Sequence, residues 1–417
     1  MQLLPILSTL RHHKLTAALL MLQVALTCAI VCNVVFMVAN RVQQVSLRTG
    51  LVESELSMVT VEGITKGENP QVRHATDLVA LRAIPGVQAV VAVDSLPLSH
   101  NESSYGTCDS QRSFNQAMAV YSMAGIVGCV NTTVYSGSQG ELAALGLKLV
   151  AGRDFRSGEY LPAKRGWVFA GVPSAIISRA LAARLYPGRG ALGQSLYMGN
   201  HPPMRIVGVV DTLLRPRLHT PGTNQLSVLV PSLPGDNTVI YVLRSAPADR
   251  GRVLKAAVAT LSRLDPDRLI PAKGTRTYAQ LRRGYFQRDT TMIGLLIASA
   301  LGLLFVTALG IAGLANFWVQ QRTRSIGIRR AVGATRGDIL RYFQAENFLI
   351  VSAGVVLGVL LAVGLNLLLM RYYELPRLPL WYLPVGALAS WVLGQLSVLS
   401  PALRASRVPP VVATRSA

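Results

Sequence analysis

Residues 291–319, TMIGLLIASALGLLFVTALGIAGLANFWV, form one run that contains no Asp, Glu, Lys or Arg. A hydrocarbon core of roughly 30 Å needs about 20 consecutive apolar helical residues, so this run is long enough to cross a bilayer. Comparable uncharged runs occupy residues 15–40, 347–370 and 380–402. The sequence therefore predicts four transmembrane helices, with residues 286–319 forming a stalk and the second of them.

Composition supports the bilayer as the main solvent. Of the 417 residues, 51% are hydrophobic and only 15% charged, and the mean hydropathy is +0.39, which is too apolar for a soluble domain of this length. The formal charge of +21 could indicate nucleic acid, but aromatic residues make up only 6% of the chain. We therefore expect membrane lipids as partners and no nucleic acid.

The first run differs from a cleavable signal peptide in its length. The apolar region of such a peptide usually has about 7–15 residues, and the uncharged run at 15–40 is longer. We interpret it as a retained anchor. Residues 1–14 place Leu at helical spacing before a basic cluster, so we expect an amphipathic helix on the cytoplasmic membrane surface.

Positive charge sets the expected orientation, because Lys and Arg near the ends of spans stay in the cytoplasm. Basic residues precede the first run, and the segments 320–346 and 403–417 are rich in arginine. Both termini and the segment 320–346 are therefore expected to be cytoplasmic. Residues 41–285 and the short loop 371–379 then lie on the outer side, with residues 41–285 inserted between the first two spans.

Small residues recur at every fourth position in the last three runs. Such stripes let helix backbones approach closely in lipid, although Gly and Ala are also simply common in membrane helices. Three stripes together favour a packed four-helix bundle or a dimer. The stripes are Gly294, Ala298 and Gly302; Gly354, Gly358 and Ala362; and Gly386, Ser390 and Gly394.

The large segment 41–285 has mixed α and β patterns, which predict an α/β or α+β ectodomain. Strands are expected at 87–93, 174–177, 204–210, 226–230 and 239–243, and helices at 76–84, 178–186 and 249–264. Cys108 and Cys129 are the only cysteines in this segment. They would lie in an oxidising compartment, which favours a disulfide, with two buried thiols as the alternative.

The sequence contains no motif for catalysis or nucleotide binding. It has no G-x-x-x-x-G-K-[ST] loop, H-E-x-x-H helix, C-x-x-C pair or G-x-S-x-G elbow, and its six histidines lack metal-ligand spacing. Cys28 and Cys32 lie one turn apart in the first span and are interpreted as buried small side chains. We expect no catalytic residue, cofactor or metal in this chain, which we interpret as a non-enzyme.

Residues 320–341, QQRTRSIGIRRAVGATRGDILR, follow the second run directly. They resemble the pattern R-T-x-E-I-G-[IL]-R-[RK]-A-[LV]-G-A of the FtsX-like permease family of ABC transporters. Glu346 matches a Glu common before the third span of that family, whereas Ser325 stands where Glu is usual. The segments 146–155 and 204–211, GLKLVAGRDF and MRIVGVVD, resemble the MacB-type periplasmic core, as do residues 176–182 and the tail 401–410.

The resemblance implies a type VII transporter, the mechanotransmission class, in the bacterial inner membrane. In such systems a separate cytoplasmic ABC ATPase dimer, which carries the ATP and Mg, drives two permease copies with periplasmic ectodomains. Gly333 and Gly337 are expected where the backbone needs positive φ or close approach. The expected coupling residues are Arg322, Arg324, Gly327, Arg329, Arg330, Gly333, Ala334, Arg336, Gly337 and Asp338.

Three functions are compatible with this resemblance. Efflux of drugs, peptides or other molecules from the periplasm, with an adaptor and an outer-membrane channel, is favoured because the segments Gly152–Arg153 and Arg205–Asp211 are closer to the MacB type. Release of lipoproteins is the nearest alternative, and a signal relay that activates a periplasmic hydrolase is another. The substrate and the choice between a homodimer and a heterodimer are not readable from the sequence.

Overall fold

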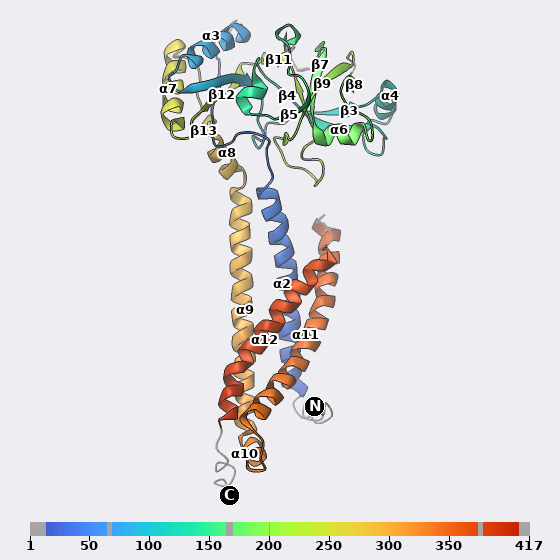
Figure 1. Cartoon of the computed structure of the whole chain (residues 1–417), viewed down its shortest axis with the longest axis vertical. Coiled ribbons are helices and arrows are strands. Elements are labelled where there is room, and N and C mark those ends of the chain that lie inside the picture. The colour runs from blue at the N-terminus through green and yellow to red at the C-terminus, as the bar shows by residue number, and fades with distance from the viewer. Residues whose placement is uncertain (1–13, 65–68, 164–169, 200, 374–377, 408–417) are drawn as a thin grey trace. The chain divides into compact units, whose positions relative to one another are not determined.

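The computed structural model of the chain describes residues 14–64, 69–163, 170–199, 201–373 and 378–407 (Figure 1). The chain divides into two compact units. One, Leu47–Gln287, is a mixed α and β domain, and the other is helical and combines Met1–Ser46 with Arg288–Ala417. Residues 1–13, most of the expected amphipathic N-terminal helix, lie outside the described part of the chain.

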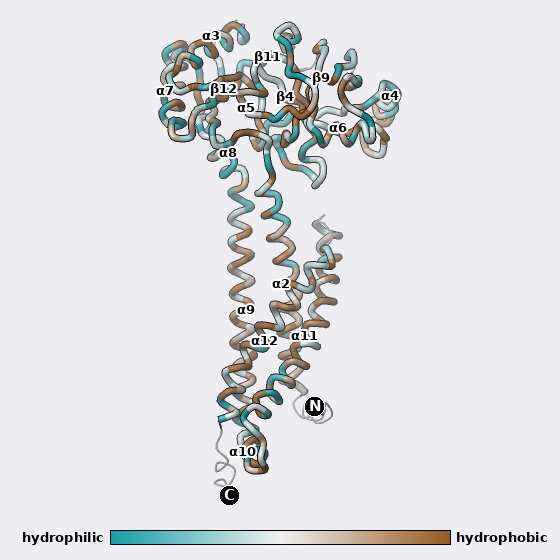
Figure 2. Tube along the Cα trace, viewed as in Figure 1, coloured by the Kyte–Doolittle hydropathy of each residue, from teal (hydrophilic) through white to brown (hydrophobic). Residues whose placement is uncertain are grey.

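Four helices of the helical unit are long and apolar enough to cross a membrane, as the four uncharged runs predict. Each extends beyond its run into polar sequence, because a hydrogen-bonded helix need not end where the apolar residues do. Figure 2 shows hydrophobic residues along these helices. They are α2 (Lys14–Val45), α9 (Gln287–Gln321), α11 (Arg336–Tyr373) and α12 (Leu383–Ser406), with the shorter α10 (Thr323–Ala331) and η3 (Leu380–Tyr382) between them.

Glycines bring α2, α11 and α12 into close contact. A Cβ atom added at Gly386 would lie 2.2 Å from the Sγ of Cys32, and one at Gly358 would lie 2.7 Å from the carbonyl oxygen of Ala25. A Cβ atom added at Gly354 would likewise lie 2.9 Å from the nearest side-chain atom, and one at Gly394 would lie 2.8 Å from its nearest. Any larger residue at these positions would force the helices apart, so these stripes pack within the chain.

Helix α9 behaves differently. A Cβ atom at Gly294 or Gly302 would meet nothing within 4 Å, and Ala298 is exposed. Packing of this stripe against another helix of the same chain, one form of the expected bundle, is therefore not observed among the described residues. A packing role for these three positions stays a prediction that requires a second chain.

The domain Leu47–Gln287 contains an antiparallel four-stranded sheet with one face covered by two helices. Buried side chains of α3 (Pro70–Arg82) and α7 (Arg250–Leu264) pack against this face. The strand order is β13 (Thr275–Thr277), β1 (Leu56–Glu62), β12 (Thr238–Ser245) and β2 (Val87–Val93). Its other face shares a core with the second sheet, α5 (Glu141–Leu145) and α8 (Tyr278–Tyr285), which joins both sheets into one domain.

The second sheet has seven strands and mixed direction. An additional pairing of β8 with β9 connects its far strand back into the sheet, so six of the strands form a closed circuit. The order is β5 (Leu149–Gly152), β9 (Met204–Val210), β7 (Ser174–Ser178), β10 (Ser227–Val230), β4 (Cys129–Ser136), β3 (Ser104–Cys108) and β8 (Ser195–Met198). The domain also contains the helices α4 (Gln111–Ala119) and α6 (Arg179–Leu185). A separate short sheet pairs β6 (Leu161–Pro162) with β11 (Ser232–Leu233). Two single turns, η1 (Ser157–Glu159) and η2 (Ala272–Gly274), lie in connections.

Most of the predicted elements of this domain are present. The strands at 87–93 and 204–210 match β2 and β9, and Ser178 caps α6 by accepting a hydrogen bond from the amide of Leu181. The helix expected at 76–84 was placed too late, because Asn69 caps a helix that already begins at Pro70. Its proline is tolerated in the first turn, where no amide donor is needed.

Candidate functional site

The site begins where α9 ends. Arg322 interrupts the helix with φ −101° and ψ 8°, and α10 follows it. The Nη1 atom of Arg322 lies 3.1 and 2.8 Å from the two carboxylate oxygens of Glu346, and its guanidinium lies 6.0 Å from the Trp318 ring centroid. The Glu346 side chain is only 3% exposed. This buried ion pair fixes the end of α9 to α11.

The turn after α10 depends on a glycine. Gly333 has φ +108°, its amide donates to the carbonyl of Arg330 at 3.2 Å, and the amide of Ala334 donates to that of Arg329 at 3.0 Å. Glycine is the residue that adopts such a backbone at a helix C-terminus without steric cost. The expectation of a special conformation is therefore met at Gly333.

Helix α11 starts with a reciprocal cap. The amide of Asp338 donates to the hydroxyl of Thr335 at 3.2 Å, and the amide of Thr335 donates to the Asp338 carboxylate at 3.0 Å. The expectation for Gly337 is corrected, because its φ is not positive and a Cβ atom there would meet only the Thr335 hydroxyl, at 3.8 Å. Gly337 needs no glycine conformation in this helix.

A hollow of about 210 Å³ lies between α10 and α11. The guanidinium of Arg329 stacks over the Tyr342 ring at 4.8 Å from its centroid, a cation–π contact that holds the two helices together. Ile326 and Phe343 are buried. The lining residues are Arg322, Ser325, Ile326, Arg329, Ile339, Tyr342 and Phe343.

The opposite face of α10 is exposed and apolar at its centre. Ile328 is 51% exposed and Val332 is 84% exposed, and they lie one turn apart, in line with the exposed Arg324. Ser325 and Arg329 border the same face. An apolar centre with a polar rim is the usual anatomy of a protein interface.

The structure places the other predicted residues on the same short segment. Gly327 is buried, and Arg330 is partly buried. The exposed residues are Arg324, Arg329, Gly333, Arg336, Gly337 and Asp338. Across residues 322–341 six arginines stand against one acid, so the exposed surface is positively charged. Among the described residues no group of His, Cys, Asp or Glu could hold a metal ion.

Sequence reasoning missed four contributors to this site. The spacing of Ile328 and Val332 in an arginine-rich segment could have indicated the apolar face, and Thr335-x-x-Asp338 could have indicated the cap. The ring of Tyr342 beneath Arg329 had no local signal. Glu346 matches a Glu that is common in the family, but its ion pair with Arg322 has no local signal, because the two residues are 24 positions apart.

Comparison with protein families decides the assignment. The model of the FtsX-like permease C-terminal region matches residues 297–410, which include this segment, and the model of the MacB-like periplasmic core domain matches residues 15–263, more than half of the chain. The chain belongs to the FtsX-like ABC-transporter permeases with a MacB-like periplasmic core. The resemblance drawn from residues 320–341 is thereby confirmed, and the permease is a subunit of a generally non-catalytic kind.

Relatives of this permease include transporters and an uncharacterised permease. It is 27% identical over 415 residues to the macrolide export ATP-binding/permease protein MacB of Sodalis glossinidius, covering 91% of this chain and 59% of the relative. It is 26% identical over 295 residues to the uncharacterised ABC transporter permease YknZ of Bacillus subtilis, covering 68% and 70%. The permease thus spans about three fifths of the length of that MacB relative.

Solved structures similar to this permease include one periplasmic region and one extracellular domain. The periplasmic region of MacB from Actinobacillus actinomycetemcomitans matches with a TM-score of 0.35 and 14% identity, covering 58% of this chain and 97% of that one. The extracellular domain of YknZ from Gram-positive bacteria matches with a TM-score of 0.32 and 16% identity, covering 51% and 99%.

Proposed function

We propose that this permease couples ATP hydrolysis by a separate cytoplasmic ABC ATPase dimer to a conformational change of its periplasmic domain. The observation that carries the proposal is the exposed face of α10. Ile328 and Val332 form an apolar centre that nothing in the described chain covers, and arginines surround it. Burial of such a face in an acidic groove of a soluble partner would stabilise the complex by the hydrophobic effect and by charge complementarity.

The anchoring of this face suits it to transmit force. The Arg322–Glu346 pair and the contact of Arg329 with Tyr342 connect α10 to α9 and α11. A displacement of α10 would therefore act on the anchored end of α9, against the fixed helix α11, rather than move only a surface loop. Helix α9 follows α8, which belongs to the domain Leu47–Gln287, after a single residue, so α9 covalently connects α10 to that domain.

The proposed setting is the bacterial inner membrane, with both termini and residues 320–346 in the cytoplasm and residues 41–285 in the periplasm. The arginine bias of the segment 322–341 and the match to a periplasmic core domain support this orientation. A second permease copy, identical or related, completes the assembly. A periplasmic adaptor and an outer-membrane channel are proposed as further partners.

Efflux from the periplasm is the proposed outcome, with drugs, peptides or other molecules as substrates. It is supported by the match of residues 15–263 to the MacB-like core and by relatives named as macrolide export proteins.

Two matched variants test the docking face. The double change Ile328→Ser and Val332→Ser removes the apolar centre without altering charge or the buried contacts of α10. The matched control Leu301→Ser also removes an exposed apolar side chain, but from α9. We expect the double variant to lose co-purification of the ATPase, measured by affinity capture from native membranes, and the control to retain it. Equal retention in both variants would contradict the docking role.

A further inference from the structure

The outer domain Leu47–Gln287 contains a cavity of about 890 Å³ that is remote in sequence from the coupling segment. Sites for drug-sized ligands usually enclose about 300–1,000 Å³. Its walls come from residues 123–131, from the end of α6 and from the turn at 219–223. The volume is therefore suited to a small molecule.

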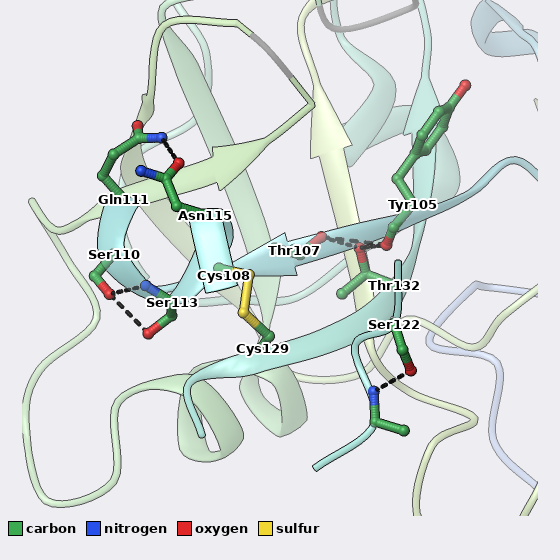
Figure 3. Close-up of a disulfide and its surroundings, with 11 residues drawn as sticks. Tyr105, Thr107, Cys108, Ser110, Gln111, Ser113, Asn115, Ser122, Cys129 and Thr132 are labelled. Atoms are coloured by element: carbon green, nitrogen blue, oxygen red, sulfur yellow. Dashed lines mark hydrogen bonds between the residues drawn. A yellow bond between two sulfur atoms is a disulfide. The ribbon is translucent and has the colours of Figure 1, made fainter. Parts of the chain in front are cut away.

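One wall is held by the disulfide between Cys108 and Cys129, the pair expected from the sequence (Figure 3). These cysteines are register partners at the ends of β3 and β4, so the bond closes the connection that carries the wall. Met123 packs over Gly106, where a Cβ atom would lie 2.0 Å from its Cε. The wall is thus fixed to the sheet rather than free to collapse into the cavity.

A buried guanidinium forms part of the polar wall. The Arg215 side chain is only 4% exposed. Its Nε donates to Glu102 and to the Thr133 hydroxyl, both at 2.8 Å, while Nη1 reaches the Asn131 carbonyl at 3.5 Å and Nη2 reaches the Ser104 hydroxyl at 3.1 Å. Each terminal nitrogen carries two hydrogens. One hydrogen on each therefore has no acceptor among the described residues.

The charge of the cavity is positive. Glu102 balances Arg215 and also accepts from His219 at 2.7 Å, but none of the lining residues is acidic. Burial alone would raise the pKa of Glu102, but hydrogen bonds from Thr133 and His219 and the charge of Arg215 outweigh it and lower this pKa. Arg184, an exposed lining residue, has no ion-pair partner among the described residues.

Apolar side chains line the remainder of the cavity. Ile126 and Val130, which are partly exposed, come from the wall held by the disulfide, while Leu185 at the end of α6 and Leu226 before β10 are buried at its base. A ligand that satisfied only the two arginines would leave Ile126 and Val130 partly exposed to water. A ligand with an apolar body would bury them and would place its anionic group against the unpaired donors of Arg215.

We propose that this cavity binds a small organic anion with an apolar body, a carboxylate or a phosphate ester. The guanidinium of Arg215 receives the anionic group, Arg184 adds the second positive charge, and the apolar wall holds the body. This site lies in a different unit from the coupling segment and does not depend on the docking proposal.

The test uses the full chain in lipid nanodiscs and three aromatic probes. Phenylacetate and phenyl phosphate carry the two anionic groups, and phenylacetamide is the neutral counterpart of phenylacetate. Hydrogen exchange of peptides covering residues 120–131 and 215–226 reports occupancy at increasing probe concentration. The variant Arg184→Gln removes a charge from an exposed side chain, and Arg179→Gln removes one from the same helix outside the lining.

We expect at least one anion to protect both peptides saturably, phenylacetamide to give no such protection, and the tighter anion to identify the preferred group. Arg184→Gln should weaken binding about tenfold, the loss of one charge-assisted contact, while Arg179→Gln should leave it unchanged. No saturable protection by either anion would overturn the proposal. Equal protection by phenylacetamide, or equal affinity of the two arginine variants, would overturn it as well.

Discussion

Helices α2 and α9 are both apolar enough to cross a membrane, yet the rest of the chain covers them very differently. In the most apolar window of α2, 56% of the residues are buried, against 6% in α9. Glycines of α11 and α12 press against α2, whereas the glycines of α9 at positions 294 and 302 face open space. Similar hydropathy therefore accompanies two different roles in the helical unit.

The contacts that α9 does make are concentrated toward its C-terminal part. Its buried residues are Thr307, Ile311, Ala315, Trp318 and Val319, all in the half next to α10. The side chains of Leu295, Leu301 and Phe305 are 61–64% exposed. The comparison suggests a fixed group of α2, α11 and α12, beside which α9 is anchored mainly at the proposed coupling segment.

The largest expected effect concerns the anchor of α9. Arg322→Ala would leave Glu346, 3% exposed, without its partner, and such a loss costs about 3 kcal/mol. The matched change Asp289→Asn removes an ion pair with Arg41 whose side chains are about a quarter exposed, so it should cost less than about 1 kcal/mol. Unfolding in detergent by steric trapping measures both free energies. Equal costs would show that α9 has no preferred anchor.

A second pair of variants separates the two kinds of glycine. Gly386→Leu would place side-chain atoms into Cys32 of α2 and should destabilise the helical unit by about 2 kcal/mol. Gly302→Leu meets no atom within 4 Å in the single chain and should be nearly neutral for the isolated subunit. Thermal unfolding of detergent-purified monomer distinguishes them. A destabilised Gly302→Leu monomer would show that Gly302 is packed within the single chain, as Gly386 is.

The open stripe of α9 predicts a contact with a second copy. Ala298→Cys should form an intermolecular disulfide under mild oxidation in membranes, since it lies in line with Gly294 and Gly302. Ala300→Cys, on the opposite face of the helix by its 3.6-residue period, is the matched control. The expected dimer yield is several-fold higher for position 298, measured by non-reducing electrophoresis. Equal yields at both positions would assign the stripe to lipid.

The smallest effect is expected at the polar contact between α2 and α9. The hydroxyls of Thr27 and Thr307 are 2.7 Å apart. Such contacts between membrane helices contribute about 0.6 kcal/mol, so Thr27→Val should reduce stability by about that amount. A cost above 2 kcal/mol, measured by steric trapping, would mean that this part of α9 is fixed as firmly as α11.

The sequence was sufficient for the four apolar helices and for the family resemblance of residues 320–341 because both signals are local. Long uncharged runs predict membrane helices, and residues 320–341 carry their family pattern without a gap. Local patterns likewise predicted β2 and β9 in the domain Leu47–Gln287. It could not predict which helices would pack, since the glycine stripes of α9 and α11 look alike in sequence and differ only in their neighbours.

Long-range pairing accounts for the other features that were not foreseen. The strand β3, SYGTC, lacks an alternating apolar pattern and is held by pairing with β4 and β8. The cavity arginine, Arg215, meets Glu102 across 113 residues of sequence. Such contacts become visible only when the closed circuit of strands is assembled.

The most direct test of the account follows the separation of α9 from the fixed helices during the ATPase cycle. Spin labels at Leu301→Cys and Leu26→Cys report α9 against α2, and labels at Leu357→Cys and Leu26→Cys report α11 against α2; all three side chains are exposed. Distances are measured by double electron–electron resonance in nanodiscs with the partner ATPase, before and after trapping with ATP and vanadate. We predict that the α9–α2 distance changes by several ångströms while the α11–α2 distance stays constant. An unchanged α9–α2 distance in a complex that hydrolyses ATP, or equal changes in both distances, would contradict the account.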